Sequence, residues 1–511
     1  MANSQVSAVD SSERVWLFFA VPLTTVLVLI MARPGISIDW FFDEAWRADM
    51  VRSFGFNRYF LNNGPLPPGW VFVHQLIFSV LPSSRELIRL VAVAPAIIAW
   101  LMIGLMLRRQ LTPKIGTTGA GVVGLGTVLL AILQPAHAHL VSYFNNYSLE
   151  TLFTALLLWV GIHDDARKSA RLFVVLAACG PWFVQSPLML LLVVAVVLWR
   201  RIEPADRWLI MTGLGALAVS AVVTYVVFLR PVSKRQIPGL GTLSGYWEGQ
   251  TFGAAGLIGS VKLVLRTLMF ETLPVRWEWS ILGWLVIGVG GLVGLRVMWS
   301  VWRWWVIAIP VTQLQILFAS VALGWPISFV RVNHAVGLLI TVLIPLGMMM
   351  AIWWIAQQLG SVTVVVSAIA VILVGIAMWP SALRMAAGGT GVFARGLSDD
   401  MDLLVPQLSE GDVVLGYHPM SSWYLHDRLV NESSVPVVLL DELEYGLFTD
   451  GVPGQLIADY APDTTSVWCV LPWELGDLIA QRCQLSNEWE LVDTQVLSRA
   501  EVRQWQRVGN S

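Results

Sequence analysis

Long apolar segments separated by short polar loops make up most of residues 15–380 of this chain. A membrane-spanning helix needs about 20 mostly apolar residues, and Lys and Arg favour its cytoplasmic end. These rules predict an α-helical polytopic membrane protein with about eleven spans, near residues 15–32, 86–107, 116–135, 149–162, 171–185, 187–199, 207–229, 279–299, 304–323, 334–357 and 361–380. The short segment 171–185 contains Gly180-Pro181, so it and 187–199 can instead form a tilted or partly re-entrant pair.

One further apolar segment, residues 67–81, is short, opens with a proline pair and contains His74. Counting it as a span would turn later basic loops such as Arg200-Arg201 outward, against the positive-inside rule. We therefore expect it to lie along the membrane interface as an amphipathic helix. The N-terminus is then cytoplasmic, and the extracytoplasmic side receives the loops 33–85, 136–148, 230–278 and 324–333.

Charge divides the chain into two physically different parts. Only 13% of all residues are charged, against roughly 25% in soluble domains. Residues 381–511 hold 19 of the 34 acidic residues and 7 of the 32 basic ones, which gives this part a net charge of −12, whereas residues 1–380 carry +10. We predict a transmembrane domain over residues 1–380 and a soluble extracytoplasmic domain over residues 381–511.

The acidic tail has the pattern of a small α/β domain. Apolar β-type runs alternate with helix-like stretches: the runs are 412–417, 435–440 and 466–471, and the stretches include 398–407 and 473–483. Cys469 and Cys483 can pair if this domain is extracytoplasmic. We expect the domain to contact a neutral glycan, a protein partner or the chain's own external loops.

Two adjacent carboxylates, Asp43 and Glu44, lie in an external loop shortly after the first apolar segment. On a helix, adjacent side chains point about 100° apart, so the two cannot do the same task. One can face a cavity while the other pairs with Arg47. Both can equally be helix caps for residues 45–54, because acidic groups are favourable near a helix N-terminus.

Glu150 opens a strongly apolar helix on the same outer face. An ionisable group at the end of a membrane helix usually faces protein or water, although a simple N-terminal helix charge explains it as well. Candidate cations on this face are Arg89, Arg331 and the cluster Arg230, Lys234 and Arg235. An arginine can bind a phosphate through two hydrogen bonds, or it can only anchor its helix at the interface.

No metal site is predicted. His137 and His139 flank Ala138, but they show no recognised ligand spacing, and the three cysteines cannot form a Cys-rich metal framework. The first external loop also lacks an Asp-x-Asp motif. No cofactor is certain from the sequence, and a divalent cation is possible but is not indicated.

The order of these features resembles the GT-C superfamily of membrane glycosyltransferases, and within it the bacterial protein O-mannosyltransferase relatives and the lipid A aminoarabinose transferases. The resemblance is detailed over residues 33–163 and weaker to residue 350. Its motifs, in chain order, are Asp43-Glu44, the proline-rich start of an aromatic helix from Pro65 to His74, the turn and Arg-Leu pair from Ser84 to Leu90, Glu150, and Arg331 with Pro345 downstream.

The resemblance implies an inverting transferase of the cell envelope that moves a sugar from a polyprenyl-monophosphate carrier to a glycan, lipid or protein acceptor on the external face. Asp43 would act as general base on the acceptor hydroxyl. Glu44 and Glu150 would orient acceptor and sugar hydroxyls. The remaining site residues that we expect to bind substrate are Arg89, Arg331 and His74 at the departing phosphate, and Asn146 and Tyr147 before the second acid.

Two departures from the family pattern leave the donor and acceptor open: Asn145-Asn146-Tyr147 replaces the usual aromatic or Arg-Pro residues, and Gly64 stands where many relatives have Lys. A transporter or flippase with the carboxylates as coupling sites is an alternative. Against it, the acids gather at one face, and the two halves of the chain show no visible match. The other alternative is an inactive assembly partner that binds through its acidic tail.

Overall fold

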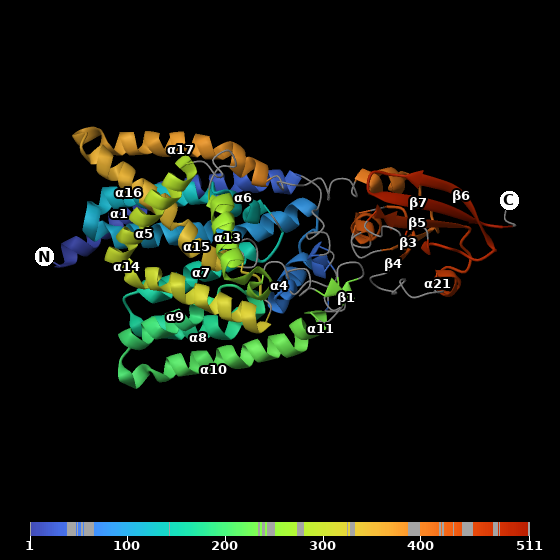
Figure 1. Ribbon diagram of the computed structural model, residues 1–511, viewed down its shortest axis with the longest axis horizontal. Helices are drawn as coiled ribbons and strands as arrows, with labels where there is room; N and C mark the ends of the chain where they lie inside the picture. Colours follow the sequence, from blue (N-terminus) through green and yellow to red (C-terminus); the bar gives the residue numbers. More distant parts are fainter. Residues whose placement is uncertain are drawn as a thin grey trace.

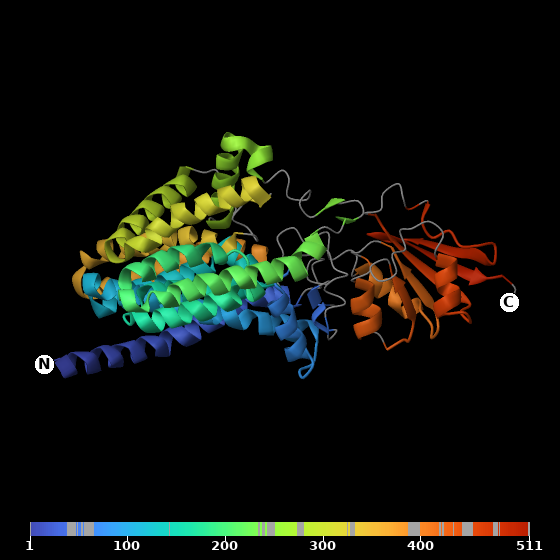
Figure 2. The same cartoon turned by 90° about the horizontal axis from the view of Figure 1, so that it is seen from below.

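The computed structural model places a bundle of long helices next to a smaller domain built on a β-sheet (Figure 1). In both views the C-terminal domain lies beyond one end of the bundle, and the N-terminus lies at the opposite end (Figures 1 and 2). The structure describes residues 2–37, 47–48, 50–52, 55, 66–142, 144–233, 236–237, 241–242, 251–272, 281–323, 325–327, 333–386, 399–417, 421, 424–432, 434–441, 453–473, 479 and 481–508.

The helices follow the apolar segments of the sequence closely. They are α1 (Ala2–Ser37), α4 (Pro68–Phe78), α5 (Arg85–Ile132), α6 (Pro135–Ser142), α7 (Tyr147–Ile162), α8 (Ala166–Phe183), α9 (Leu188–Arg201), α10 (Trp208–Val223), α11 (Arg230–Ser233), α13 (Phe252–Thr272), α14 (Ile281–Leu323), α15 (His334–Thr341), α16 (Leu343–Gln357) and α17 (Thr363–Ala386). A π-helical turn, Thr224–Leu229, joins α10 to α11.

Six helical segments of the described chain are long and apolar enough to cross a membrane. They are Ser11–Arg33, Arg85–Ile132, Pro204–Leu229, Gly283–Ala322, Gly337–Gln357 and Gly360–Ala386. The chain is therefore a membrane protein, as expected. The number of eleven spans stays a prediction.

Two of these segments each cover two predicted spans. In α5 the backbone leaves the helical conformation at Gly116, whose φ of +73° is a left-handed value that glycine adopts readily. In α14 the break falls at Trp302, with φ −155° and ψ 62°. Gly116 is the first residue of the second predicted span, and Trp302 lies between the predicted spans 279–299 and 304–323, so both breaks fall at the predicted divisions.

Helix α4 is the segment expected at the membrane interface. It has 11 residues, and at a rise of 1.5 Å per residue it is about 17 Å long, too short for a hydrocarbon core of about 30 Å. It begins at Pro68, where a proline is tolerated because the first helical N–H needs no partner. Its interfacial position stays a prediction.

Helices α15 and α16 meet near Pro345, and a side chain of the neighbouring segment supplies the hydrogen bond that this proline removes. Pro345 has no N–H to pair with the carbonyl of Thr341, four residues earlier. Gln134 Nε2 donates to that carbonyl at 2.9 Å. His137 Nε2 lies 3.0 Å from Thr341 Oγ1. The polar residues before and within α6 therefore stabilise the kink, and His137 is engaged there.

Small residues bring α14 and α16 into close contact. A Cβ at Gly347 would overlap the carbonyl group of Gly290, and one at Gly294 would overlap the carbonyl oxygen of Leu343. Small residues at helix interfaces are the usual way for membrane helices to pack, because lipid provides no hydrophobic drive for their association. The two helices are thus fixed by direct backbone contact.

The C-terminal domain contains a five-stranded sheet with the strand order β4-β3-β5-β7-β6. The three predicted β-type runs form the parallel strands β3 (Val413–Gly416), β4 (Val438–Asp441) and β5 (Ser466–Pro472). The hairpin of β6 (Trp489–Val496) and β7 (Ala500–Arg507), which the sequence did not predict, adds to β5 in antiparallel register. The described part of the domain also contains a helix at 399–404, the 3-10 turn η6 (Val405–Gln407), the π-helix η7 (His426–Glu432) and α21 (Pro453–Tyr460).

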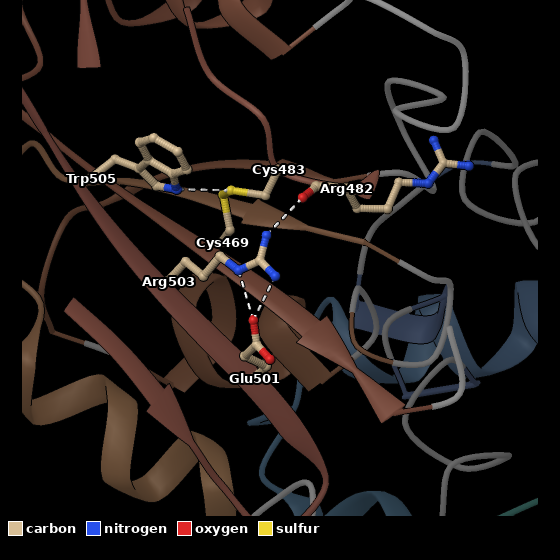
Figure 3. The surroundings of a disulfide bond; sticks show 6 residues. All are labelled: Cys469, Arg482, Cys483, Glu501, Arg503 and Trp505. Atoms are coloured by element: carbon tan, nitrogen blue, oxygen red, sulfur yellow. Dashed lines mark hydrogen bonds and ion pairs between the residues drawn. A yellow bond between two sulfur atoms is a disulfide. The ribbon is translucent and has the colours of Figure 1, made fainter. Parts of the chain in front are cut away.

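A disulfide between Cys469 and Cys483 fastens β5 to the segment before β6 (Figure 3). Both cysteines are buried, and Trp505 Nε1 lies 3.1 Å from Cys483 Sγ. Next to the bond, Arg503 donates to Glu501 at 2.7 Å and to the carbonyl of Arg482 at 3.1 Å (Figure 3). Most of the predicted helix at 473–483 lies outside the described residues.

The two domains share one continuous apolar cluster. It contains Trp70 and Phe144 from the helical part and Met401, Leu404 and Tyr424 from the C-terminal part. This contact agrees with the expectation that the acidic tail meets the chain's own external segments. The domain boundary predicted after residue 380 stays a prediction, since α17 continues to Ala386.

A candidate active site at the base of the C-terminal domain

Three of the predicted site residues, Asp43, Glu44 and Arg331, lie outside the described residues, and so do Lys234 and Arg235. Their predicted roles stay predictions. The described residues of the site come from the segment after Asp43-Glu44, from α4 and the start of α5, and from the start of α7.

The segment after Asp43-Glu44 is attached to the start of α7. Arg47, three residues after Glu44 in sequence, is buried, and its Nη1 donates to the carbonyl of Phe144 at 3.5 Å. Gln75 of α4 holds the same segment through hydrogen bonds from Nε2 to the carbonyls of Met50, at 2.8 Å, and Gly55, at 2.7 Å. Arg47, Met50 and Gly55 are therefore held beside α4 and the residues before α7.

His74 is buried in an aromatic pocket between α4 and Phe144. Its ring centroid lies 4.3 Å from Trp70 and 5.5 Å from Phe144, and its Nδ1 is 2.8 Å from the Trp70 carbonyl oxygen. Burial lowers the pKa of His74 from 6.5 to about 4. This shift favours a neutral ring at pH 7. The expected contact of His74 with the departing phosphate stays a prediction.

Arg89 lies in the first two turns of α5, near the same pocket. The helix begins after Ser84, whose Oγ accepts a hydrogen bond from Leu87 N at 3.3 Å. The Arg89 side chain is only 1% exposed, next to Ile88 and Ala92 of the shared apolar cluster. Arg89 is therefore a guanidinium buried beside this cluster.

Glu150 lies in the first turn of α7, as predicted, and is 2% exposed. Described residues give its carboxylate four hydrogen bonds. Asn146 Nδ2 donates to Oε1 at 3.1 Å, and the backbone N–H groups of Gln185 and Ser186 donate to the same oxygen at 2.9 and 3.3 Å. Ser186 Oγ donates to Oε2 at 2.7 Å. Glu150 therefore connects the start of α7 to the turn between α8 and α9.

The residues before Glu150 form a buried polar turn. Asn145 Oδ1 accepts from Tyr147 N at 2.6 Å, which fixes the orientation of its amide. Among the described residues, the Nδ2 of Asn145 has no hydrogen-bond partner although it is buried. Asn146 is engaged with Glu150, and Tyr147 is half-buried. Whether Asn146 and Tyr147 touch a substrate stays a prediction.

Sequence reasoning missed the Gln185-Ser186 turn, because no motif marks it and its partner lies 35 positions earlier. The only local sign was Ser186-Pro187 directly before an apolar run, which is typical of a helix start. A polar turn at the start of a membrane helix needs a partner for its N–H groups, and a buried carboxylate is one such partner.

An open apolar groove of about 470 Å³ begins at Met189, three residues after Ser186. One wall is Met189 at the start of α9. The other wall consists of side chains from α14, namely Val311, Leu314, Gln315, Phe318 and Ala319. The groove has almost no polar surface, so it suits a hydrocarbon chain rather than a sugar.

Comparisons with known proteins connect this arrangement to a fold. No model of a known protein family matches the chain, and no curated protein matches it. Among solved structures, ArnT from Cupriavidus metallidurans in the apo state superposes with a TM-score of 0.58 at 14% identity, covering 96% of this chain and 98% of that one. This chain has an ArnT-like fold.

The form of ArnT that was crystallised with undecaprenyl phosphate matches with a TM-score of 0.53, again at 14% identity and with the same coverage. The ArnT-like fold spans both domains, and it confirms the fold class expected from the sequence. At this identity the likeness concerns the fold, and the chemistry has to be argued from the residues of this chain.

Proposed function

We propose that this protein is an integral-membrane glycosyltransferase that moves a sugar from a polyprenyl-monophosphate carrier to an acceptor on the extracytoplasmic face. The observation that carries the proposal is the ArnT-like fold over 96% of the chain, one ArnT form being bound to undecaprenyl phosphate. The resemblance in motif order, from Asp43 to Arg331, supports the same reaction class from an independent direction.

The apolar groove supports a lipid-linked donor. A polyprenyl chain is a long linear hydrocarbon of isoprene units, each with a methyl branch. It therefore needs an open apolar surface to lie on. The groove between Met189 and α14 offers this surface, and it starts close to the polar turn at Ser186. A carrier placed there would have its tail against α14 and its phosphate toward the polar turn at Ser186.

The reaction needs a base and positive charge. Asp43 would accept the proton of the acceptor hydroxyl while that oxygen forms a bond to the anomeric carbon from the side opposite the phosphate. The bond between the anomeric carbon and the phosphate oxygen breaks, and its electron pair leaves with the polyprenyl phosphate. Arg89 and Arg331 would stabilise the negative charge that grows on the phosphate.

The disulfide supports the extracytoplasmic placement of the C-terminal domain. Structural disulfides persist in oxidising compartments and are rare in the cytosol. Cys469 and Cys483 are both buried and bonded in that domain. The helix α4 and the C-terminal domain lie at the same end of the bundle, so the candidate site would share this compartment (Figure 1).

The base assignment is tested by Asp43→Asn in purified protein. A positioned general base contributes about 10²- to 10⁴-fold, so we expect the rate of sugar transfer to fall by at least about 100-fold while the folded yield is unchanged. Asp165→Asn is the control, because Asp165 caps α8 by accepting from Lys168 N, and asparagine caps equally well. The substitution also removes the ion pair of Asp165 with Lys168 at 3.4 Å, but both side chains are exposed and such a pair contributes little.

Full transfer activity in Asp43→Asn would contradict Asp43 as the base. Protein that binds a polyprenyl-phosphate sugar but never consumes it would instead favour an assembly partner. Electrogenic or proton-coupled movement of an intact lipid-linked substrate across vesicles would favour a transporter.

A further inference from the structure

Glu150 is the most fully engaged carboxylate in the described part of the candidate site. Its Oε1 accepts three hydrogen bonds and its Oε2 accepts one, all from protein groups. A general acid or base must exchange a proton with the substrate, and a group that orients a sugar hydroxyl must have an acceptor site available. Oε2 keeps a second acceptor site, but Glu150 is only 2% exposed, so a substrate would reach this site only if the surrounding protein groups moved.

Three of the four donors to Glu150 belong to Gln185 and Ser186, and these donors need a hydrogen-bond acceptor. Gln185 and Ser186 form the turn directly before α9, whose N-cap is Pro187, a residue with no side-chain acceptor. The N–H groups of Leu188, Met189 and Leu190 in the first turn of α9 are already paired with backbone carbonyls of this turn. The N–H groups of Gln185 and Ser186 precede the helix, and a buried backbone N–H without a partner is costly in a membrane. The Glu150 carboxylate accepts from both of them and from the Ser186 hydroxyl.

We propose that Glu150 is a positioning residue that fixes the Gln185-Ser186 turn, and with it the Met189 wall of the apolar groove, so that the carrier lipid can bind. The lipid part of this inference rests on the proposed function. Met189 follows Ser186 by three residues, less than one helical turn, so a displacement of the turn moves Met189 relative to α14.

Glu150→Gln separates this role from a chemical one. A glutamine keeps the shape of glutamate, and its Oε1 can accept from Asn146 and from both backbone N–H groups. Its Nε2 can donate to Ser186 Oγ, because a hydroxyl accepts as readily as it donates. Every positioning contact survives this substitution, whereas a titrating or charged function does not. Glu150→Ala removes all four contacts.

The experiment compares wild type with Glu150→Gln, Glu150→Ala, Ser186→Ala and the control Thr154→Val. Thr154 is buried one turn further along α7, and its hydroxyl only returns to the carbonyl of Glu150 in its own helix. The probes are binding of undecaprenyl phosphate in detergent micelles, followed by tryptophan fluorescence, and hydrogen exchange of the peptide that covers residues 184–190. Transfer kinetics with a consumed donor complete the set.

We expect Glu150→Gln and Thr154→Val to bind undecaprenyl phosphate within about threefold of wild type and to leave exchange at 184–190 unchanged. Ser186→Ala should weaken binding by about tenfold, because it removes the hydrogen bond between Ser186 Oγ and Glu150 Oε2 that helps to fix the turn. It should raise the KM for the lipid donor far more than it lowers kcat. Glu150→Ala should weaken binding further and accelerate the exchange, and if it does not fold, Ser186→Ala carries the test.

A Glu150→Gln protein that binds normally but loses at least about 100-fold in kcat would overturn the proposal, because that loss is the mark of a chemical role. Unchanged exchange at 184–190 and unchanged binding in Ser186→Ala would overturn it as well. Failure of wild type itself to bind undecaprenyl phosphate, with accelerated exchange in Ser186→Ala, would instead overturn the proposed function and keep the positioning contact.

Discussion

The hydrogen bond from Gln134 to the Thr341 carbonyl should be energetically coupled to Pro345. That carbonyl loses its helical donor to the proline, and Gln134 Nε2 replaces it at 2.9 Å. Gln134→Leu keeps the approximate side-chain volume and removes the donor. Pro345→Ala restores a backbone N–H that can reach the same carbonyl. In the second background, the donor from Gln134 is no longer needed.

The size of the effect follows from two opposing contributions. An orphaned buried carbonyl costs about 1–3 kcal/mol, and hydrogen bonds inside membrane proteins average about 0.6 kcal/mol, with a maximum near 1.7. The Oε1 of Gln134 is itself buried without a partner among the described residues, so its removal offsets part of the loss. We expect Gln134→Leu to cost about 1 kcal/mol alone and less than about 0.3 kcal/mol beside Pro345→Ala.

Reversible unfolding in mixed micelles, titrated with SDS, measures all four corners of this double-mutant cycle. Thr127→Val is the control, because the Thr127 hydroxyl bonds the carbonyl of Val123 in its own helix and should add independently to Pro345→Ala. Equal costs of Gln134→Leu in both backgrounds, within about 0.3 kcal/mol, would refute the account of the kink. The kink matters for function because α15 begins just after the segment that contains Arg331.

Three further predictions concern the pocket, the helix contact and the C-terminal domain. Burial lowers the pKa of His74 from 6.5 to about 4 in the folded protein. As the pH falls through this range, the unfolded chain binds a proton before the folded one does, so the free energy of unfolding should fall by up to about 3 kcal/mol. A His74→Gln protein whose free energy of unfolding falls equally steeply with pH would contradict this. Gly347→Ala should destabilise the protein by about 1–3 kcal/mol through overlap with the α14 backbone, whereas Gly288→Ala, with nothing within 4 Å of its Cβ, should be nearly neutral in the same unfolding assay. Cys469 and Cys483 should resist alkylation in denatured whole-cell extracts until a reductant is added, and labelling without reduction would argue against an oxidising compartment.

Much of the fold could be predicted because its determinants are local. Apolar length marks a membrane helix, and the breaks at Gly116 and Trp302 fall where basic residues interrupt the apolar runs. The three parallel strands were visible as short β-type runs between polar stretches. The β6–β7 hairpin was not, because most of the β6 side chains are exposed and show no apolar alternation.

The site could be predicted only in part, because its contacts join distant segments. That Glu150 opens α7 follows from the sequence around it. Its attachment to Ser186 does not, since nothing in either segment names the other. The neutral state of His74 likewise depends on burial against Phe144, which is 70 positions away. Residue type predicts which groups can do chemistry, and packing determines which of them are available for it.

Turnover of a lipid-linked donor tests the central claim most directly. Purified wild-type protein is incubated with a panel of polyprenyl-monophosphate sugars and an extract of envelope acceptors, and the release of free polyprenyl phosphate is measured. The account predicts acceptor-dependent release from at least one donor, with inversion at the anomeric carbon of the product. Binding of the donors without any release, under conditions in which the protein remains folded, would contradict it.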